Sequence, residues 1–121
     1  MNSFRPVIIA PTYNNARTLS GVIDQIRAAV PDVPILVVND GATDDTATVL
    51  AALGDGTDVI THPTNRGKAA ALRTGFEHAA ATGFTHALTI DTDGQHDPAD
   101  IPALLAIADT NPTALVAGAR A

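Results

Sequence analysis

Short runs of apolar residues alternate along the chain with longer stretches in which apolar residues recur every three or four positions. The short runs are continuous, which is typical of strands buried on both faces of a parallel sheet. About five such strands are expected, over residues 7–10, 35–38, 58–61, 85–90 and 114–117.

The periodic stretches between these runs predict helices. Asn14 or Asn15 is expected to cap the first helix, and Thr43 the second, while Asp97-Pro98 marks the start of the last. The apolar faces of the four helices are expected at Ala16, Leu19, Ile23, Ile26 and Val30; at Val49, Leu50 and Leu53; at Ala69, Leu72, Phe76, Ala79 and Ala80; and at Ile101, Leu104, Leu105 and Ala108.

Strands that alternate with helices imply βαβ crossovers, and therefore a mostly parallel sheet with helices on both faces. The fold class expected is a three-layer α/β/α domain. The sequence has no internal repeat or linker, so residues 1–121 are expected to form a single domain.

Composition narrows the range of functions. The chain has 121 residues, of which 45% are apolar and 17% charged, as in a soluble globular domain. A net charge of −6 argues against non-specific binding of nucleic acid, and the absence of cysteine excludes disulfides and thiolate metal sites. No transmembrane or signal-peptide pattern is present, so a cytoplasmic location is expected.

Polar segments follow four of the predicted strands, at residues 11–14, 39–41, 65–68 and 91–93. Because the carboxyl ends of parallel strands share one edge of the sheet, these segments are expected to lie together, where open α/β sheets bind their ligands. Ordinary turn chemistry would not by itself concentrate tyrosine, aspartate and lysine on that edge.

Asp91 and Asp93 form an Asp-x-Asp pair directly after an apolar strand. Two close carboxylates repel each other unless a cation lies between them, and hard divalent metals prefer such oxygen ligands. The pair therefore suggests a metal–diphosphate site. Aspartate followed by glycine is also typical of an ordinary turn.

Other candidate side chains on this edge could likewise either bind a ligand or have an ordinary structural role. Asp40 could accept a hydrogen bond from a base or ribose, and Tyr13 could pack against either group, but both also suit a turn or the core. Arg66 and Lys68 begin a helix, where cations oppose the macrodipole unless an anion binds nearby; they could also be solvated surface charges. The histidines at 62, 78 and 86 show no ligand spacing and are expected at the surface or a sheet edge, while His96 could approach the metal or belong to a turn.

At this point four segments resemble family 2 glycosyltransferases in their residues, order and spacing. They are VIIAPTYN at 7–14, VVNDGATDDT at 37–46, NRGKAAALRTG at 65–75 and DTDGQHDP at 91–98. The last segment looks most like the branch that contains the dolichyl-phosphate (polyprenyl-phosphate) mannose and glucose synthases.

This resemblance implies the Rossmann-like half of a GT-A fold. It implies that the domain binds a UDP- or GDP-sugar with Mg²⁺ or Mn²⁺ and transfers the hexosyl group to an acceptor, a polyprenyl phosphate or a glycan. By resemblance, the donor site comprises Pro11, Tyr13, Asn14, Asp40, Lys68, Asp91 and Asp93. Asp91, Asp93 and Gln95 would hold the metal, and Arg120 would lie near the acceptor phosphate.

Two departures from the family pattern change these expectations. Asn15 stands where many relatives have a glutamate, and Asn39 replaces the first aspartate of the frequent Asp-Asp-Gly. The acceptor-binding half and the catalytic base are expected beyond the fifth strand, so no base is named. A homodimer or a missing C-terminal half is expected to cover an apolar edge, and the enzyme is expected at the cytoplasmic face of a membrane.

Two rival functions stay open. A non-catalytic nucleotide-sugar-binding module would bind the donor without turnover. A sugar-phosphate nucleotidyltransferase would have a glycine-rich phosphate loop after its first strand, where this chain has Pro11-Thr12-Tyr13-Asn14.

Overall fold

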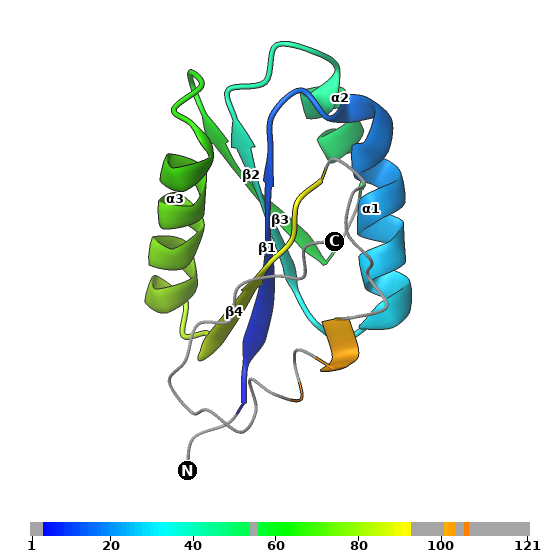
Figure 1. Cartoon of the computed structure of the whole chain (residues 1–121), viewed down its shortest axis with the longest axis vertical. Coiled ribbons are helices and arrows are strands. Elements are labelled where there is room, and N and C mark those ends of the chain that lie inside the picture. The colour runs from blue at the N-terminus through cyan, green and yellow to red at the C-terminus, as the bar shows by residue number, and fades with distance from the viewer. Residues whose placement is uncertain (1–3, 54–55, 93–100, 104–105, 107–121) are drawn as a thin grey trace.

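The computed structural model describes residues 4–53, 56–92, 101–103 and 106, and strands and helices alternate along this part of the chain (Figure 1). The elements are β1 (Pro6–Thr12), α1 (Ala16–Ala29), β2 (Ile35–Asp40), α2 (Thr46–Ala51), β3 (Thr57–His62), α3 (Lys68–Ala81) and β4 (His86–Thr89). The predicted α/β class is confirmed.

The described strands form one parallel sheet in the order β3-β2-β1-β4. The chain moves outward from β1 to β2 and β3 and then returns to place β4 on the other side of β1. The order of the strands therefore reverses between β1 and β4. In open α/β sheets, ligands bind at such a switch point, outside the carboxyl ends of the strands.

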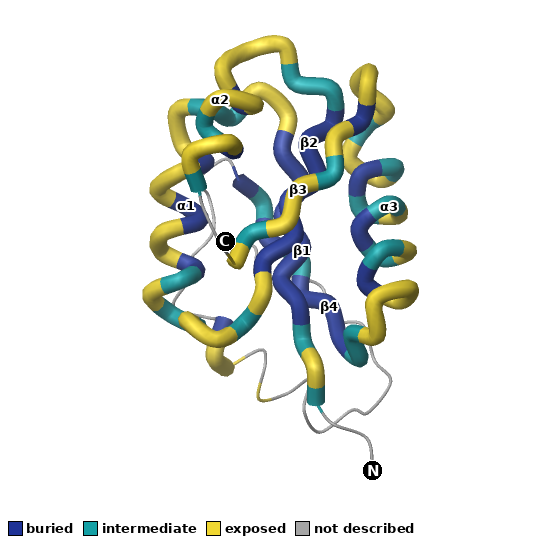
Figure 2. Tube along the Cα trace, turned by 180° about the vertical axis from the view of Figure 1, so that it is seen from behind, coloured by how far each residue is buried: buried dark blue, intermediate teal, exposed yellow. Residues whose placement is uncertain are grey.

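Two apolar cores cover the two faces of this sheet. On one face, the side chains of Ile8 and Ala10 pack beneath α1 and α2; on the other, those of Val7 and Ile9 pack beneath α3. Residues next to each other in β1 thus serve opposite cores, which explains why this strand is an unbroken apolar run. Figure 2 shows β1 and β2 as buried strands and much of β3 as exposed.

The buried face of α3 agrees with the expected one only in part: Ala79 is buried, and Leu72 and Phe76 pack against the core. Its buried residues are Ala71, Gly75 and Ala79, whereas Ala69 and Ala80, expected in the core, are exposed. A Cβ atom on Gly75 would lie 2.6 Å from Ile9 Cγ2, so the helix backbone approaches β1 more closely than a larger residue would allow. A line of small residues, flanked by Leu72 and Phe76, therefore sets the depth of this helix.

The second helix starts later than expected. It begins at Thr46, and Thr43 does not cap it. Instead, the carboxylate of Asp44 accepts hydrogen bonds from the backbone N–H of Thr46 (3.0 Å) and from its hydroxyl (2.5 Å). An aspartate is the stronger acceptor for the N–H groups at a helix start, where the macrodipole also favours a negative charge.

Two predicted elements lie wholly or partly outside the described residues. The strand at 114–117 and the helix start at Asp97-Pro98 belong to the part of the chain that is not described. Residues 101–103 are helical, as expected, and Ile101 is buried in the core beneath α1. Among the described helices, none has the length and hydropathy needed to cross a bilayer.

Candidate donor-binding site

A pocket of about 280 Å³ opens at the switch point, on the carboxyl edge of the sheet. Its volume is at the lower end of the range for small-molecule sites. It is lined by residues at or just after the carboxyl ends of all four strands and by the first turn of α3: Pro11, Thr12, Tyr13, Asn15, Asp40, Asn65, Gly67, Lys68, Ala71, Asp91 and Thr92. The structure therefore brings Pro11, Tyr13, Asp40, Lys68 and Asp91 together, as the sequence predicted for these side chains.

Asp40 is buried at the end of β2 and accepts hydrogen bonds through both carboxylate oxygens. Oδ1 accepts from the backbone N–H of Arg66 (2.9 Å), and Oδ2 accepts from that of Gly67 (2.8 Å). His62 Nδ1 lies 2.8 Å from the same Oδ1. Asp40 thus anchors the loop between β3 and α3, residues 63–67, while its direct contact with a nucleotide stays a prediction.

These contacts determine the charge of Asp40. Burial opposes ionisation of the carboxyl group, but the hydrogen bonds from His62, Arg66 and Gly67 outweigh it and hold the Asp40 pKa below its ordinary value of 3.8. Asp40 is therefore a carboxylate at neutral pH, with a charge that the surrounding donors stabilise.

Asp40→Asn is expected to lower the free energy of unfolding by about 3 kcal/mol at pH 7, because an amide cannot accept from all of these donors. Because the pKa of Asp40 is lower in the folded state, its ionised carboxylate stabilises the folded protein at pH values above the unfolded-state pKa. This contribution is lost as the pH falls through the folded-state pKa. The difference between wild type and variant should therefore shrink below about pH 4. Urea denaturation at pH 7 and pH 3 measures this difference in the free energy of unfolding, with Asp24→Asn on the exposed side of α1 as control. An equal difference at both pH values would contradict the lowered pKa of Asp40.

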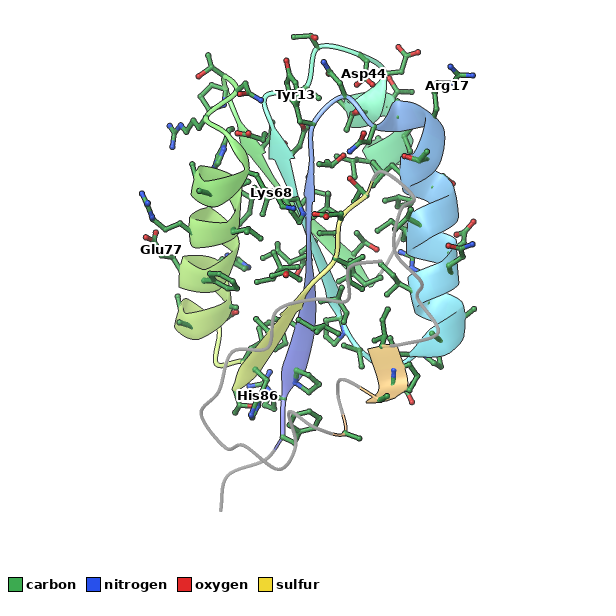
Figure 3. All side chains as sticks on the ribbon, in the orientation of Figure 1. Tyr13, Arg17, Asp44, Lys68, Glu77 and His86 are labelled. Atoms are coloured by element: carbon green, nitrogen blue, oxygen red, sulfur yellow. The ribbon has the colours of Figure 1, made fainter. Side chains whose placement is uncertain are left out.

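Lys68 and Asp91 form an ion pair across the pocket. Lys68 extends from the first turn of α3 towards the segment after β4, and its Nζ lies 2.5 Å from Asp91 Oδ1 (Figure 3). The side chain of Lys68 is 51% exposed and that of Asp91 22%, so solvent reaches the pair. The Asp91 carboxylate lines the pocket and has the hard oxygen donors that a divalent metal prefers.

Of the expected metal ligands, Asp91 is the one that belongs to the described residues. No group of three or more His, Asp or Glu residues that could hold a metal occurs within the described part of the chain. Two of the expected ligands, Asp93 and Gln95, lie outside it, as do His96 and the expected acceptor-phosphate residue Arg120. Asp91 lines the pocket, and its role as a metal ligand stays a prediction.

Asn14 connects two loops instead of lining the pocket. Its backbone has a φ of +53°, and its Oδ1 accepts hydrogen bonds from the N–H groups of Thr43 (2.8 Å) and Asp44 (3.3 Å). The Asp44 carboxylate in turn accepts from the backbone N–H of Ala16 at 3.2 Å. Hydrogen bonding from the Thr46 hydroxyl helps to hold the Asp44 pKa below its ordinary value.

This link positions Tyr13, the residue before Asn14. Tyr13 is one of the described large hydrophobic side chains that are exposed, at 45%; it lines the pocket and lies just after the end of β1 (Figure 3). An aromatic ring held in water by a rigid loop suits stacking on a ligand. A direct contact of Asn14 with a nucleotide sugar stays a prediction.

Asn15 and Thr92 join the first loop to the segment after β4. Asn15 Nδ2 donates to Thr92 Oγ1 at 2.9 Å, and the Thr92 hydroxyl donates to the carbonyl oxygen of Pro11 at 3.1 Å. Thr12, which also lines the pocket, is the only described buried side chain with a polar atom that lacks a hydrogen-bond partner. A buried orphan hydroxyl at a pocket is consistent with a site built to receive a polar ligand.

Of the two places expected for His62 and His86, the structure confirms the sheet edge and not the surface. Both lie at the edges of the described sheet, but they are 5% and 4% exposed. His62 is held by Asp40 and Thr74, and His86 packs edge-on against Phe4 with ring centroids 4.9 Å apart. Ligand spacing along the sequence could not reveal partners that the sheet register brings together.

The described residues form a doubly wound α/β domain with a charged pocket at its switch point. The sequence profile described as glycosyl transferase family 2 matches residues 7–121. The chain therefore belongs to glycosyltransferase family 2, and its parallel sheet with helices has the fold of the GT-A glycosyltransferases.

Individual relatives agree with this membership. A polyprenol monophosphomannose synthase from Mycolicibacterium smegmatis is 35% identical over 109 residues, covering 87% of this chain and 41% of that protein. An undecaprenyl-phosphate mannosyltransferase from Micrococcus luteus is 34% identical over 119 residues, covering 96% of this chain and 48% of that protein. The solved glucosyl-3-phosphoglycerate synthase from Mycobacterium tuberculosis, in complex with Mn²⁺, UDP and glucosyl-3-phosphoglycerate, is 27% identical, with a TM-score of 0.67 over 88% of this chain and 40% of that one.

The chain spans less than half of the length of these curated relatives. The expected acceptor-binding half and the expected homodimer stay predictions.

Proposed function

We propose that this domain binds the nucleotide diphosphate of a UDP- or GDP-sugar together with Mg²⁺ or Mn²⁺. It then serves as the donor-binding part of an enzyme that transfers a hexosyl group to an acceptor. The observation that carries the proposal is the pocket at the switch point, whose lining includes the aromatic ring of Tyr13 and, beside each other, the oppositely charged Lys68 and Asp91.

Each group has a distinct task in this proposal. Tyr13 packs against the base or ribose, because its ring is exposed and its loop is held on both sides. Lys68 leaves Asp91 and neutralises part of the diphosphate charge. Asp91, with Asp93 and Gln95, would hold the metal, and the metal would supply Lewis-acid stabilisation of the leaving diphosphate.

A polyprenyl phosphate is the acceptor class that we favour. The support is the identity of 34–35% with two proteins named for polyprenol or undecaprenyl phosphate. The solved relative that contains UDP and Mn²⁺ supports the donor and the metal.

The test is a thermal-shift panel of UDP, GDP, UDP-glucose and GDP-mannose, each with and without Mn²⁺. A ligand present at about one hundred times its Kd should stabilise the folded protein by about 2.7 kcal/mol. The Glu77→Gln variant is the control for a carboxylate-to-amide change outside the pocket, because Glu77 lies on α3 but its side chain points away from the pocket (Figure 3). Metal-dependent stabilisation by one nucleotide, retained in Glu77→Gln, is the expected result; a folded protein that responds to no nucleotide would overturn the proposal.

A further inference from the structure

His62 is not among the residues that line the pocket, but it is hydrogen-bonded to Asp40, which is. It is the last residue of β3, and the register of the sheet places it directly opposite Asp40 at the end of β2. Its Nδ1 lies 2.8 Å from Asp40 Oδ1, and its Nε2 lies 2.8 Å from the hydroxyl of Thr74 on α3. One imidazole ring therefore connects β2, β3 and α3.

The charge of Asp40 determines which way the first of these bonds runs. An ionised carboxylate can only accept hydrogen bonds, so His62 Nδ1 must carry a proton and donate it. The Thr74 hydroxyl can both donate and accept, so it can bond Nε2 whether or not that nitrogen is protonated. The ring is thereby held in one orientation.

The Asp40 carboxylate that His62 restrains holds the wall of the pocket. It accepts from the N–H groups of Arg66 and Gly67, and the carbonyl of Asp40 accepts from Asn65 Nδ2 at 3.3 Å. Asn65 and Gly67 line the pocket, and Lys68 follows them directly. The position of the 63–67 loop, and with it the start of α3, thus depends on one carboxylate whose orientation a buried histidine determines.

We propose that His62 is a positioning residue of the donor site: through Asp40 it holds the 63–67 loop in the conformation that places Asn65 and Lys68 at the nucleotide diphosphate. The consequence for binding rests on the proposed function. The effect of His62 on the order of the loop does not rest on the proposed function, because it can be measured in the ligand-free protein.

The two ring nitrogens can be tested separately. His62→Asn retains an amide donor near the position of Nδ1, whereas His62→Gln places its amide near the position of Nε2 and loses the donor to Asp40. Thr74→Val removes only the outer bond. His86→Gln is the matched control, because His86 is equally buried but lies at the opposite end of the sheet (Figure 3).

The first measurement is amide hydrogen exchange of Arg66 and Gly67 by NMR, with global stability measured in parallel by urea denaturation. In His62→Gln, exchange of both amides should increase by about tenfold or more beyond the change explained by global stability, the size expected for loss of a bond to a charged group. His62→Asn should restore most of this protection. His86→Gln should lose global stability without a selective change at these two amides.

The second measurement is the Kd of UDP and GDP in the presence of Mn²⁺. We expect His62→Gln to weaken binding of the preferred nucleotide by about tenfold, Thr74→Val to have a smaller effect, and His62→Asn and His86→Gln to remain near wild type. If the wild type binds neither nucleotide, the proposed function fails, while the exchange data still decide whether His62 orders the loop. Unchanged exchange at Arg66 and Gly67 in a folded His62→Gln protein, or the same change in His86→Gln, would overturn the inference.

Discussion

Asp91→Asn is expected to weaken metal-dependent nucleotide binding by about 100-fold, because it removes a negative oxygen ligand from the proposed metal site. The variant keeps the size and shape of the side chain, so the surrounding segment should stay folded. Isothermal titration with Mn²⁺ alone, nucleotide alone and both together measures the loss. Nucleotide binding without metal should change much less, and an equal loss in both conditions would contradict a role for Asp91 at the metal.

A substitution of Lys68, the other partner of the ion pair, gives a complementary test. The Lys68 side chain is half exposed and solvent screens the pair, which contributes about 1 kcal/mol, so a divalent cation can displace the Lys68 ammonium group from Asp91 at little cost. Lys68→Met should therefore leave or slightly strengthen the binding of Mn²⁺ alone, while it weakens the binding of nucleotide. A loss of Mn²⁺ affinity in Lys68→Met would show that the Lys68 ammonium group does not occupy the place of the metal beside Asp91.

Gly41→Ala is expected to lower the free energy of unfolding by about 3 kcal/mol, combining a left-handed backbone with overpacking. Gly41 has a φ of +69°, and a Cβ atom there would lie 2.3 Å from the backbone nitrogen of Asn65 and from the backbone carbonyl carbon of Thr64. These are backbone atoms of the 63–67 loop, which the adjacent Asp40 holds in place. The loop cannot move away without breaking bonds to that carboxylate.

Urea denaturation measures this effect against a control with the same chemical change. Gly21→Ala also adds one methyl group, but Gly21 lies on the exposed side of α1 and has no atom within 4 Å of the new Cβ. It should stabilise the protein by about 0.5–1 kcal/mol, since alanine loses less backbone entropy in a helix. A Gly41→Ala protein as stable as wild type would mean that the two loops are not in close contact.

Much of the fold follows from the sequence, because the physical causes are local. An unbroken apolar run such as 7–10 can be stable only where both faces of a strand are covered, and the alternation with helices then sets parallel pairing. Parallel pairing in turn places Tyr13, Asp40, Lys68 and Asp91 at one edge. The existence and place of the pocket could therefore be predicted without coordinates.

The partners within the site could not be predicted in this way. Asp40 and His62 are 22 residues apart and meet only because the register of β2 and β3 pairs them. Periodicity was only partly right in α3: Leu72, Phe76 and Ala79 pack on the core as expected, but alanines occur on every side of the helix, and the pattern did not identify Ala71 and Gly75 as buried. Both outcomes depend on distances between elements, which no local pattern records.

The hydrogen bonds among the loops have a consequence for protein engineering. The loop after β1 is tied through Asn14 to residues 43–44, and through Asn15 to Thr92. A loop transplanted from a relative to alter donor preference would arrive without the amide and carboxylate groups that match its new neighbours. Loop exchange should therefore succeed when the segments after β1, β2 and β4 are transferred as one module, and fail when they are transferred one at a time.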